Sequence, residues 1–281
     1  MELPIKNYKL LLVIPIALMV VSAGILITHY MRTGEWFNRS FELTGGTLVT
    51  IETKQATDIG AVESALSQFK VSVRSLTGFG GSKLLIQAGS DADSKAIIAA
   101  LGSIGIDTSV SSVQTIGPAL SESFWVQAQL ALAAAFVFMG IVVFVLFRDP
   151  VPSGYVMLCA FSDIVVAMAL MQVFGIELSL ASLGGLIMLL DYSVDTDILL
   201  TTRCLRGTGT FGERWKSSVK TGFTMFGTAF GALVALYISG LSPVISEIAA
   251  VLILGLCADV ILTWIQNSVL LKVHMERKGL L

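Results

Sequence analysis

Three aspartates lie close together inside an apolar stretch of this chain. Asp191, Asp195 and Asp197 interrupt a run of mainly leucine, isoleucine, methionine and glycine that begins at Leu178. An ionised carboxylate at bilayer depth costs about 2.5 kcal/mol or more on insertion scales, and such groups usually mark function. We therefore expect at least one of the three to serve an ion or proton pathway.

Helical geometry divides these three residues between two faces. At about 100° per residue, Asp191 and Asp195 lie about 40° apart, whereas Asp197 lies about 200° from Asp195. Thr202 shares the face of Asp195, about 20° away. One face of the helix therefore cannot present all three carboxyl groups to a single partner.

Basic residues beyond this stretch leave two interpretations open. In one, Asp195 and Asp197 reach the lipid headgroups or pair with Arg203 and Arg206, and the charges only anchor the helix. In the other, Lys220 at the start of the next apolar segment is the counter-charge of an aspartate, and protonation of the acid releases the base and lets the helices shift. A snorkelling membrane anchor is the alternative role of Lys220.

Two further apolar segments carry acids. Asp163 stands in one, and Asp259 in the other is followed by Thr263, Gln266 and Asn267 at spacings of three and four. Such a polar stripe faces protein or water rather than lipid. Hydrogen bonding between helices is the role that we expect for Asp163, Asp259 and Asn267.

The composition is that of an integral membrane protein. Of the 281 residues, 54% are hydrophobic and 14% are charged, against about 25% charged in soluble domains. The net charge is −2, and there is no basic patch for nucleic acid. The three cysteines and two histidines predict neither a disulfide framework nor a metal site. No nucleotide-binding or metalloprotease motif is present, so we predict no enzyme activity and no cofactor.

Six apolar segments are long enough to cross a bilayer, which takes about 20 helical residues. They are Leu10–Tyr30, Phe124–Phe147, Ser153–Phe174, Leu178–Thr202, Val219–Ser239 and Val244–Leu271. We expect the first to be a retained anchor rather than a cleaved signal peptide, because its apolar run exceeds the about 7–15 residues of a signal core. Small residues that allow close packing of helices are Gly184, Gly185, Gly222, Gly227 and Gly231.

Lysine and arginine gather at alternate ends of these segments. They are Lys6, Lys9, Arg148, Arg203, Arg206, Arg214, Lys216, Lys272, Arg277 and Lys278, whereas the opposite turns Gly175–Glu177 and Gly240–Pro243 carry none. Because short cytoplasmic loops are enriched in basic residues, both termini are predicted to be cytoplasmic. The polar insert between the first two segments is then exterior to the cytoplasmic membrane.

The insert alternates between strand and helix periods. The predicted elements are Thr47–Thr53, Asp58–Phe69, Val71–Thr77, Ser82–Ala88, Asp91–Ile104 and Val110–Ile116, in the order βαββαβ of a ferredoxin-like α+β domain. One sheet face stays open to solvent or to a partner. The predicted domains are residues 1–34, with the cytoplasmic N-terminus and first helix, 35–120, the exterior domain, and 121–281, with five helices and the cytoplasmic C-terminus.

Two motifs give the chain a resemblance to a known family. Glu42-Leu-Thr-Gly-Gly-Thr47 resembles the Asp-Phe-Thr-Gly-Gly-Thr motif of the SecF family of protein-export membrane proteins. Tyr192-Ser-Val-Asp195-Thr-Asp197-Ile-Leu-Leu-Thr-Thr-Arg203 resembles that family's Tyr-Ser-Leu-Asn-Asp-Thr-Val-Val-Val-x-Asp-Arg. The resemblance covers essentially the whole chain, and Val-Asp-Thr-Asp is of the archaeal type.

The resemblance implies a role in protein export. Members pair with a SecD-like subunit, are built like resistance-nodulation-division transporters, and assist the passage of unfolded polypeptide through the Sec channel. The implied energy source is the proton or sodium gradient. Two alternatives stay open. One is a small-molecule or lipid transporter half of the same broad fold, which needs a substrate cavity and a complete twelve-helix unit or a homo-oligomer. The other is a scaffold that stabilises SecD without using an ion.

The resemblance also implies roles for individual residues. An acid in the fourth helix and a base early in the fifth are implicated in ion coupling, which here favours Asp195, then Asp197, with Lys220 as the base. Asp191 stands where the family usually has glycine, so its role stays open. Thr44, Gly45, Gly46 and Thr47 match the exterior motif, whereas Leu43 replaces a phenylalanine.

Overall fold

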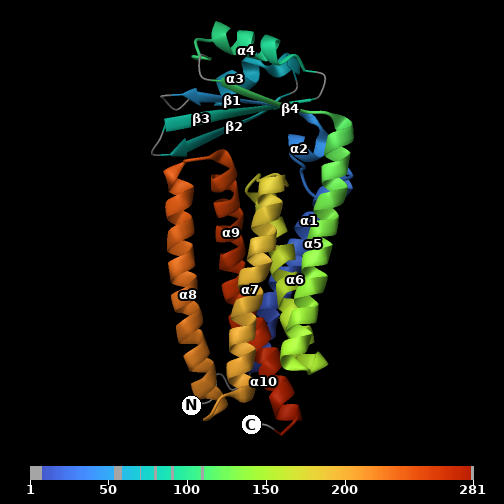
Figure 1. The fold of residues 1–281 in the computed structure, drawn as a ribbon, viewed down its shortest axis with the longest axis vertical. Coiled ribbons are helices and arrows are strands. Elements are labelled where there is room, and N and C mark those ends of the chain that lie inside the picture. The colour runs from blue at the N-terminus through green and yellow to red at the C-terminus, as the bar shows by residue number, and fades with distance from the viewer. Residues whose placement is uncertain are drawn as a thin grey trace.

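The helices form a bundle that carries a small α/β layer at one end (Figure 1). The computed structural model describes residues 8–53, 59–69, 71–78, 81–89, 92–108 and 111–279. Lys6, Asp58, Asp91 and Val110, which belong to predicted segments or their flanks, lie outside these residues. Both chain ends lie at the end of the bundle opposite the sheet.

Long helices make up the bundle. They are α1 (Val13–Thr33, preceded by the 3-10 turn η1, Tyr8–Leu12), α5 (Pro118–Phe147), α6 (Pro150–Val173), α7 (Leu180–Arg206), α8 (Phe211–Ser239), and a run of α9 (Pro243–Ile261), the π-helical η3 (Leu262–Asn267) and α10 (Ser268–Arg277). Among the described residues, five candidate membrane spans are long and apolar enough to cross a bilayer: η1–α1, α5, α6, α8 and the α9–α10 run. The protein is therefore mostly helical, with several membrane-length apolar helices.

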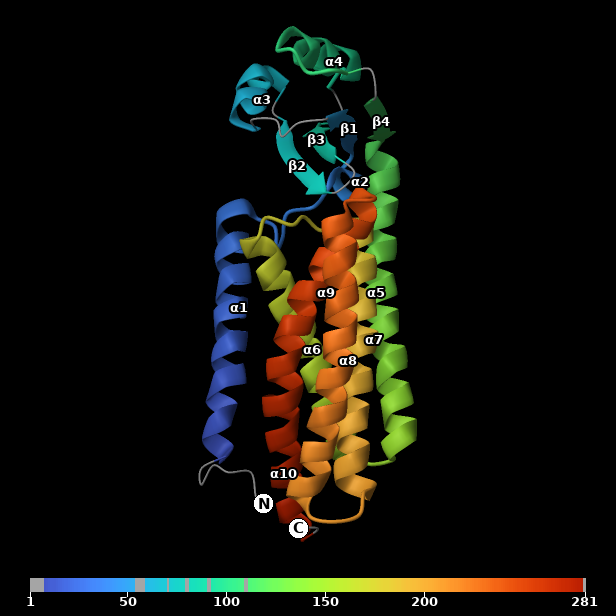
Figure 2. The same cartoon turned by 90° about the vertical axis from the view of Figure 1, so that its left-hand side faces the viewer.

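The remaining long helix, α7, occupies the middle of the bundle. It has 27 residues but is not among the five apolar spans, because Asp191, Asp195 and Asp197 interrupt it. It contacts α5, α6, α8 and α9, and α1 stands to one side against α6 (Figure 2). The helix that carries Asp191, Asp195 and Asp197 thus has helix neighbours on several sides.

Two helices begin well before their apolar runs. α5 begins at Pro118 rather than Phe124, with proline in its first turn. α8 begins at Phe211 rather than Val219, because Thr210 and Glu213 form a capping box. Apolar runs show only the part of a helix at bilayer depth, whereas caps decide where the backbone begins to coil.

Within the described residues, a four-stranded antiparallel sheet forms the α/β layer at one end of the bundle. Its strands are β1 (Gly46–Thr53), β2 (Ser72–Gly78), β3 (Gly81–Ala88) and β4 (Ser111–Ile116), in the order β2-β3-β1-β4. The helical elements are α2 (Phe41–Thr44), α3 (Ile59–Ala65), η2 (Ser67–Phe69) and α4 (Ser94–Ser103). From β1 onward, the strands and α-helices follow the predicted order βαββαβ.

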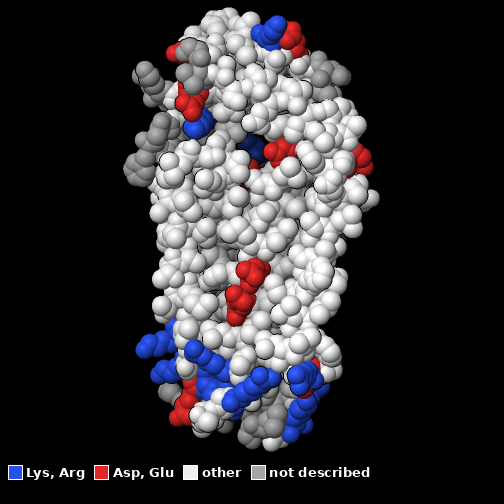
Figure 3. Space-filling model, in the orientation of Figure 1, with Lys and Arg blue, Asp and Glu red and all other residues white. Residues whose placement is uncertain are grey.

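The two faces of the sheet have different neighbours. Val49 opposes Ile86 on β3 and Val113 on β4, and alternate residues such as Val49 and Ile86 pack beneath α3 and α4 with Val62 and Ile97. The other face looks toward the helix bundle across a cleft of about 350 Å³. Figure 3 shows the hollow between the α/β layer and the helices. The sheet face that the sequence leaves open therefore lies over the ends of the helices.

We expect Gly222→Ala to destabilise the packing of α8 on the α9–α10 run. A Cβ at Gly222 would lie 2.0 Å from Trp264 Cζ2, so the indole ring must move. Overpacking of this kind costs about 1–3 kcal/mol. A lower apparent melting temperature of the purified protein would show it.

Gly227→Ala is the matched control on the same helix. A Cβ there meets no described atom within 4 Å. Alanine also favours the helix by about 1 kcal/mol over glycine, so this variant should be as stable as the parent or more stable. Equal loss of stability in both variants would contradict the packing explanation.

Candidate functional site

Asp191 and Asp195 lie on an exposed stripe of α7. Both side chains are exposed, as is Met188 one turn away. Figure 3 shows an acidic patch on this face, midway along a broad band that otherwise has no charged atoms. In Figure 1, α8 and α5 run on either side of α7. The two residues that helical geometry places on one face therefore share an uncovered surface of this chain.

Asp197 lies on the opposite face and is fully buried. It is 0% exposed, and its Oδ1 accepts a hydrogen bond of 2.7 Å from Nδ2 of Asn267. Asp163 of α6 and Asp259 of α9 are also buried and lie within electrostatic range of Asp197. The structure thus separates Asp197 from Asp191 and Asp195 and joins it to two acids for which we expected only packing roles.

Hydroxyl and amide groups connect these buried acids. Ser193 Oγ donates to Oδ2 of Asp163, and Thr263 Oγ1 donates to Oδ1 of Asp259 at 2.8 Å. The predicted polar stripe, which runs from Asp259 of α9 into η3, is buried and faces protein. Within the described residues, no group of histidine, cysteine and acidic side chains has the arrangement of a metal site.

The π-helical segment η3 turns this polar stripe toward α6 and α7. Gln266 Nε2 donates to Ser162 Oγ of α6 at 3.3 Å, and Asn267 bonds Asp197 of α7. Trp264, from the same turn, packs against α8 at Gly222. A π-helical turn changes the direction of side chains relative to an α-helix, and such turns are frequent at functional sites.

The basic residues near α7 have other partners. Arg203 donates to the Ser217 carbonyl at 2.9 Å and to Thr221 Oγ1 at 2.8 Å, both on α8. Arg206 donates to the Leu146 carbonyl at 2.9 Å. Lys220 is exposed and forms no ion pair with any acid in the described part of the chain. The pairing of Asp195 with Lys220 stays a prediction.

The motif of residues 42–47 attaches to the start of α7. Glu42 Oε2 accepts a hydrogen bond of 2.8 Å from the Leu180 amide, the first residue of α7. Leu43 is buried in one core cluster with Leu183 and Leu186 of α7. The helix N-terminus carries unpaired N–H groups and a partial positive charge, so a carboxylate stabilises it. Two motif residues therefore hold the helix that carries the acids.

The glycines of the motif are required by close backbone contacts. Gly45 and Gly46 have φ angles of +84° and +156°. A Cβ at Gly46 would lie 2.5 Å from the Ala88 carbonyl oxygen, and one at Gly45 would lie 3.3 Å from Pro118 Cα. Thr44 Oγ1 donates to the Ser40 carbonyl at 3.0 Å, and Thr47 Oγ1 lies 3.1 Å from Thr115 Oγ1. The motif is thus the joint between the sheet and the helices.

Further contacts at this joint involve residues that the sequence did not single out. The Ser40 amide donates to the Leu178 carbonyl at 2.8 Å, and Arg74 of β2 forms an ion pair of 2.7 Å with Glu177. Burial raises the pKa of Glu177, and the Arg74 charge opposes that rise. Ser179, the N-cap of α7, donates to Glu247 of α9. Each partner is distant in sequence, so only the tertiary fold identifies these pairs.

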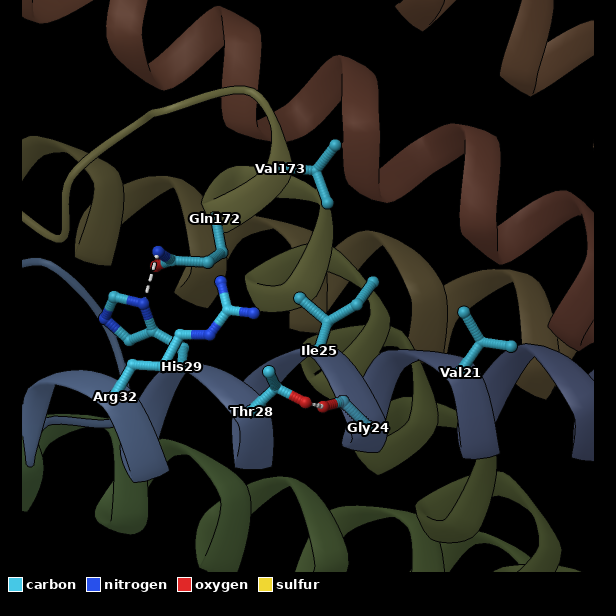
Figure 4. Close-up of a pocket in the computed structure, with 8 residues that line it drawn as sticks. All are labelled: Val21, Gly24, Ile25, Thr28, His29, Arg32, Gln172 and Val173. Atoms are coloured by element: carbon cyan, nitrogen blue, oxygen red, sulfur yellow. Dashed lines mark hydrogen bonds between the residues drawn. The ribbon is translucent and has the colours of Figure 1, made fainter.

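A shallow groove of about 520 Å³ runs between α1 and α6 (Figure 4). Val21 and Ile25 line it at one end, and His29, Arg32 and Gln172 line the other. Gln172 Nε2 lies 2.9 Å from His29 Nδ1. This contact ties α1 to α6, which gives His29 a structural partner.

Comparison with known sequences gives the family. Residues 96–277 match the family described as protein export membrane protein SecD/SecF, C-terminal. Protein-export membrane protein SecF of Pyrococcus furiosus is 40% identical over 96% of this chain and 92% of its own length. SecF of Methanothermobacter thermautotrophicus is 38% identical over 97% and 94%, and SecF of Methanocaldococcus jannaschii is 39% identical over 96% and 97%.

The chain belongs to the SecF family. Its role is that of a SecF subunit in protein export, and these relatives are archaeal, in keeping with the Val194-Asp-Thr-Asp197 sequence. The motif residues that resemble SecF are those that join the sheet to α7.

Two solved structures share the fold. The crystal structure of SecDF, a translocon-associated membrane protein from Thermus thermophilus, superposes with a TM-score of 0.75 at 18% identity, over 99% of this chain. SecDF in a super-membrane-facing form gives a TM-score of 0.59 at 17% identity, over 97% of this chain. The SecF-family chain spans about two fifths of each SecDF chain, 40% and 39%.

We expect Glu42→Ala to loosen the first turn of α7. The Leu180 amide would lose its acceptor, and loss of a cap costs about 0.5–2 kcal/mol. Amide hydrogen exchange measured by mass spectrometry should accelerate in the peptide that contains residues 180–184. Glu63→Ala, at an exposed position of α3, is the control and should leave that peptide unchanged. Unchanged exchange in Glu42→Ala would mean that the contact does not hold the helix.

Proposed function

We propose that this chain works with a SecD-like subunit as an ion-coupled accessory of the Sec channel. In this proposal six helices, α7 included, cross the cytoplasmic membrane, and the exterior layer is a ferredoxin-like domain of residues 35–120. The domain helps an unfolded polypeptide to pass through the channel, and the proton gradient supplies the energy. Residues 1–34 and 121–281 provide the helices, and the protein acts as a transport subunit rather than an enzyme.

The proposed partnership with a SecD-like subunit rests on the exposure of Asp191 and Asp195. Both lie within the long apolar band, where contact of an ionised carboxylate with lipid is costly and such residues almost always face protein or water. A second membrane subunit that covers this stripe of α7 removes the cost. Gly184 and Met188, on the same side of the helix, are a small residue and an adaptable apolar residue that suit close helix packing.

The proposed orientation rests on where the basic residues lie. Figure 3 shows lysine and arginine gathered at the end of the bundle opposite the sheet, where both chain ends lie. Basic residues are enriched on the cytoplasmic side of membrane proteins. We accordingly assign the termini to the cytoplasm and the sheet to the exterior.

The proposed coupling uses acids of α7. Asp195 is the leading residue, with Asp197 second, and Lys220 is the counter-charge that α8 supplies when the helices shift. Asp191, next to Asp195 on the exposed stripe, raises the local negative charge and favours proton uptake at that face. Movement of α7 would reach the exterior domain directly, because Glu42 and Leu43 contact its first turns.

Two other functions make different demands on the same surface. A small-molecule or lipid transporter needs a complete unit with a substrate cavity that the acids line. A scaffold for SecD needs only the covered stripe and tolerates replacement of the acids by neutral residues of similar shape. Membership of the SecF family supports a role in export over a role as a small-molecule or lipid transporter. The Asp195→Asn experiment below distinguishes ion-coupled export from a scaffold role.

We expect Met188→Cys to cross-link to the SecD-like subunit in membranes. Met188 is 54% exposed and lies on the acidic stripe. The background is Cys257→Ser, because Cys257 is exposed whereas Cys159 and Cys204 are buried. Val20→Cys on α1, away from the stripe, is the control at 65% exposure. Cross-linking through Val20→Cys with none through Met188→Cys would place the partner elsewhere.

We expect Asp195→Asn to abolish the gradient-dependent part of export. The amide cannot take up a proton, so the rate should fall to the level seen without a gradient, while the complex with the SecD-like subunit still co-purifies. Glu122→Gln, an exposed acid at the start of α5, is the control and should export normally. Normal gradient-dependent export by Asp195→Asn in an intact complex would favour the scaffold.

A further inference from the structure

We propose that Asp163, Asp197 and Asp259 form a buried proton-holding site inside this chain, separate from the exposed pair Asp191 and Asp195. The inference deepens the proposed function, on which it rests only for its biological use, because it places protonatable groups within the subunit itself. The site takes a proton from water or from the exposed stripe of α7. It then holds that proton with residues of this chain alone.

Three different helices supply the carboxyl groups. Asp163 comes from α6, Asp197 from α7 and Asp259 from α9, and their exposed fractions are 0%, 0% and 2%. Ser193 Oγ donates to Asp163 and also lies against Asp259, so the serine connects α7 with both neighbours. The site therefore depends on the packing of these three helices, and a displacement of any of them changes the distances between the carboxyl groups.

Unpartnered acceptor atoms point to a missing hydrogen. Asn267 is 0% exposed, and its Nδ2 donates to Asp197 Oδ1 at 2.7 Å. Its Oδ1 has no hydrogen-bond partner among the described residues, and neither have Oδ2 of Asp197 and Oδ1 of Asp163. These atoms are acceptors when the acids are ionised. A buried polar atom left unpaired costs about 1–3 kcal/mol.

A proton on the carboxyl group of Asp197 supplies the donor that this arrangement lacks. The new O–H bond forms at Oδ2, the carboxylate becomes neutral, and the hydroxyl can donate to an acceptor such as Asn267 Oδ1. The Oδ1 atom keeps its bond from Asn267 Nδ2. A carboxylic acid and a carboxamide can thus pair through one donor and one acceptor on each side.

The three buried acids have no positively charged partner among the described residues, which favours their protonated form. No lysine, arginine or histidine in the described chain forms an ion pair with any of the three acids. The other titratable side chains that face the acids are Cys159 of α6 and Tyr192 of α7, both neutral or acidic groups. Buried charges without a counter-charge are strongly disfavoured, so the acids stay in place mainly by holding protons.

Infrared spectroscopy of the purified full-length chain in lipid nanodiscs tests the proposal. Protonated carboxyl groups have a C=O stretching band apart from that of carboxylates. We expect a band at neutral pH that is smaller in Asp163→Asn, Asp197→Asn and Asp259→Asn. The controls Glu63→Gln and Glu122→Gln, at exposed acids of α3 and α5, should keep it. Circular dichroism and size-exclusion chromatography verify that each variant is folded.

Three outcomes would overturn the proposal. The first is the absence of a protonated-carboxyl band from the parent protein at neutral pH, which needs no variant. The second is a band that Asp191→Asn or Asp195→Asn removes while the three buried substitutions leave it. The third is a band lost in sodium chloride and kept in choline chloride at the same pH, which would identify a sodium site. Because no partner, channel or gradient is present, the result is independent of the export experiment.

Discussion

The cost of placing a carboxyl group at bilayer depth is the constraint on which this structure depends. α7 carries three acids in its membrane-length stretch, and each must meet protein, water or a proton. The fold places the three acids in two different environments. Asp197 turns inward, where α6 and the α9–α10 run supply polar partners, and Asp191 and Asp195 turn outward on a stripe that a second subunit can cover.

The burial of Asp197 on the inner face of α7 accounts for much of the arrangement of the bundle. α7 occupies the centre because its buried face needs neighbours that offer hydrogen bonds. The π-helical turn η3 brings Gln266 and Asn267 to α6 and α7 while Trp264 packs on Gly222 of α8. Close packing therefore accompanies polar contact at the same level of the bundle. A change in the charge of the buried acids would act on several helices together.

The α/β layer is linked to the same helix at its other end. Glu42 binds the first amide of α7, and Leu43 enters the core cluster that includes Leu183 and Leu186. From Leu180 to Asp197 the helix rises about 26 Å, at about 1.5 Å per residue. One helix thus extends from the sheet to the level of the buried acids.

The sequence by itself determined the class of protein, the positions of the apolar segments, the order of strands and helices in the α/β layer, and the division of the α7 acids between two faces. Each follows from local periodicity or composition: about 100° per helical residue separates Asp197 from Asp195 without any knowledge of neighbours. The sequence also resembled SecF at both motifs. Helix ends such as Pro118 and Phe211 extended beyond the apolar runs because caps, and not hydropathy, begin a helix.

Only the tertiary structure decided which polar groups meet. Asp163, Asp197 and Asp259 are far apart along the chain, and nothing local indicates that three helices bring them to one place. The same holds for Glu42 at the start of α7 and for Arg203, which bonds Thr221 on α8 instead of an acid. Such pairs depend on the rotation and register of whole helices. The rotation and register of a helix are determined by the packing of many side chains at once, so they cannot be predicted from any single stretch of sequence.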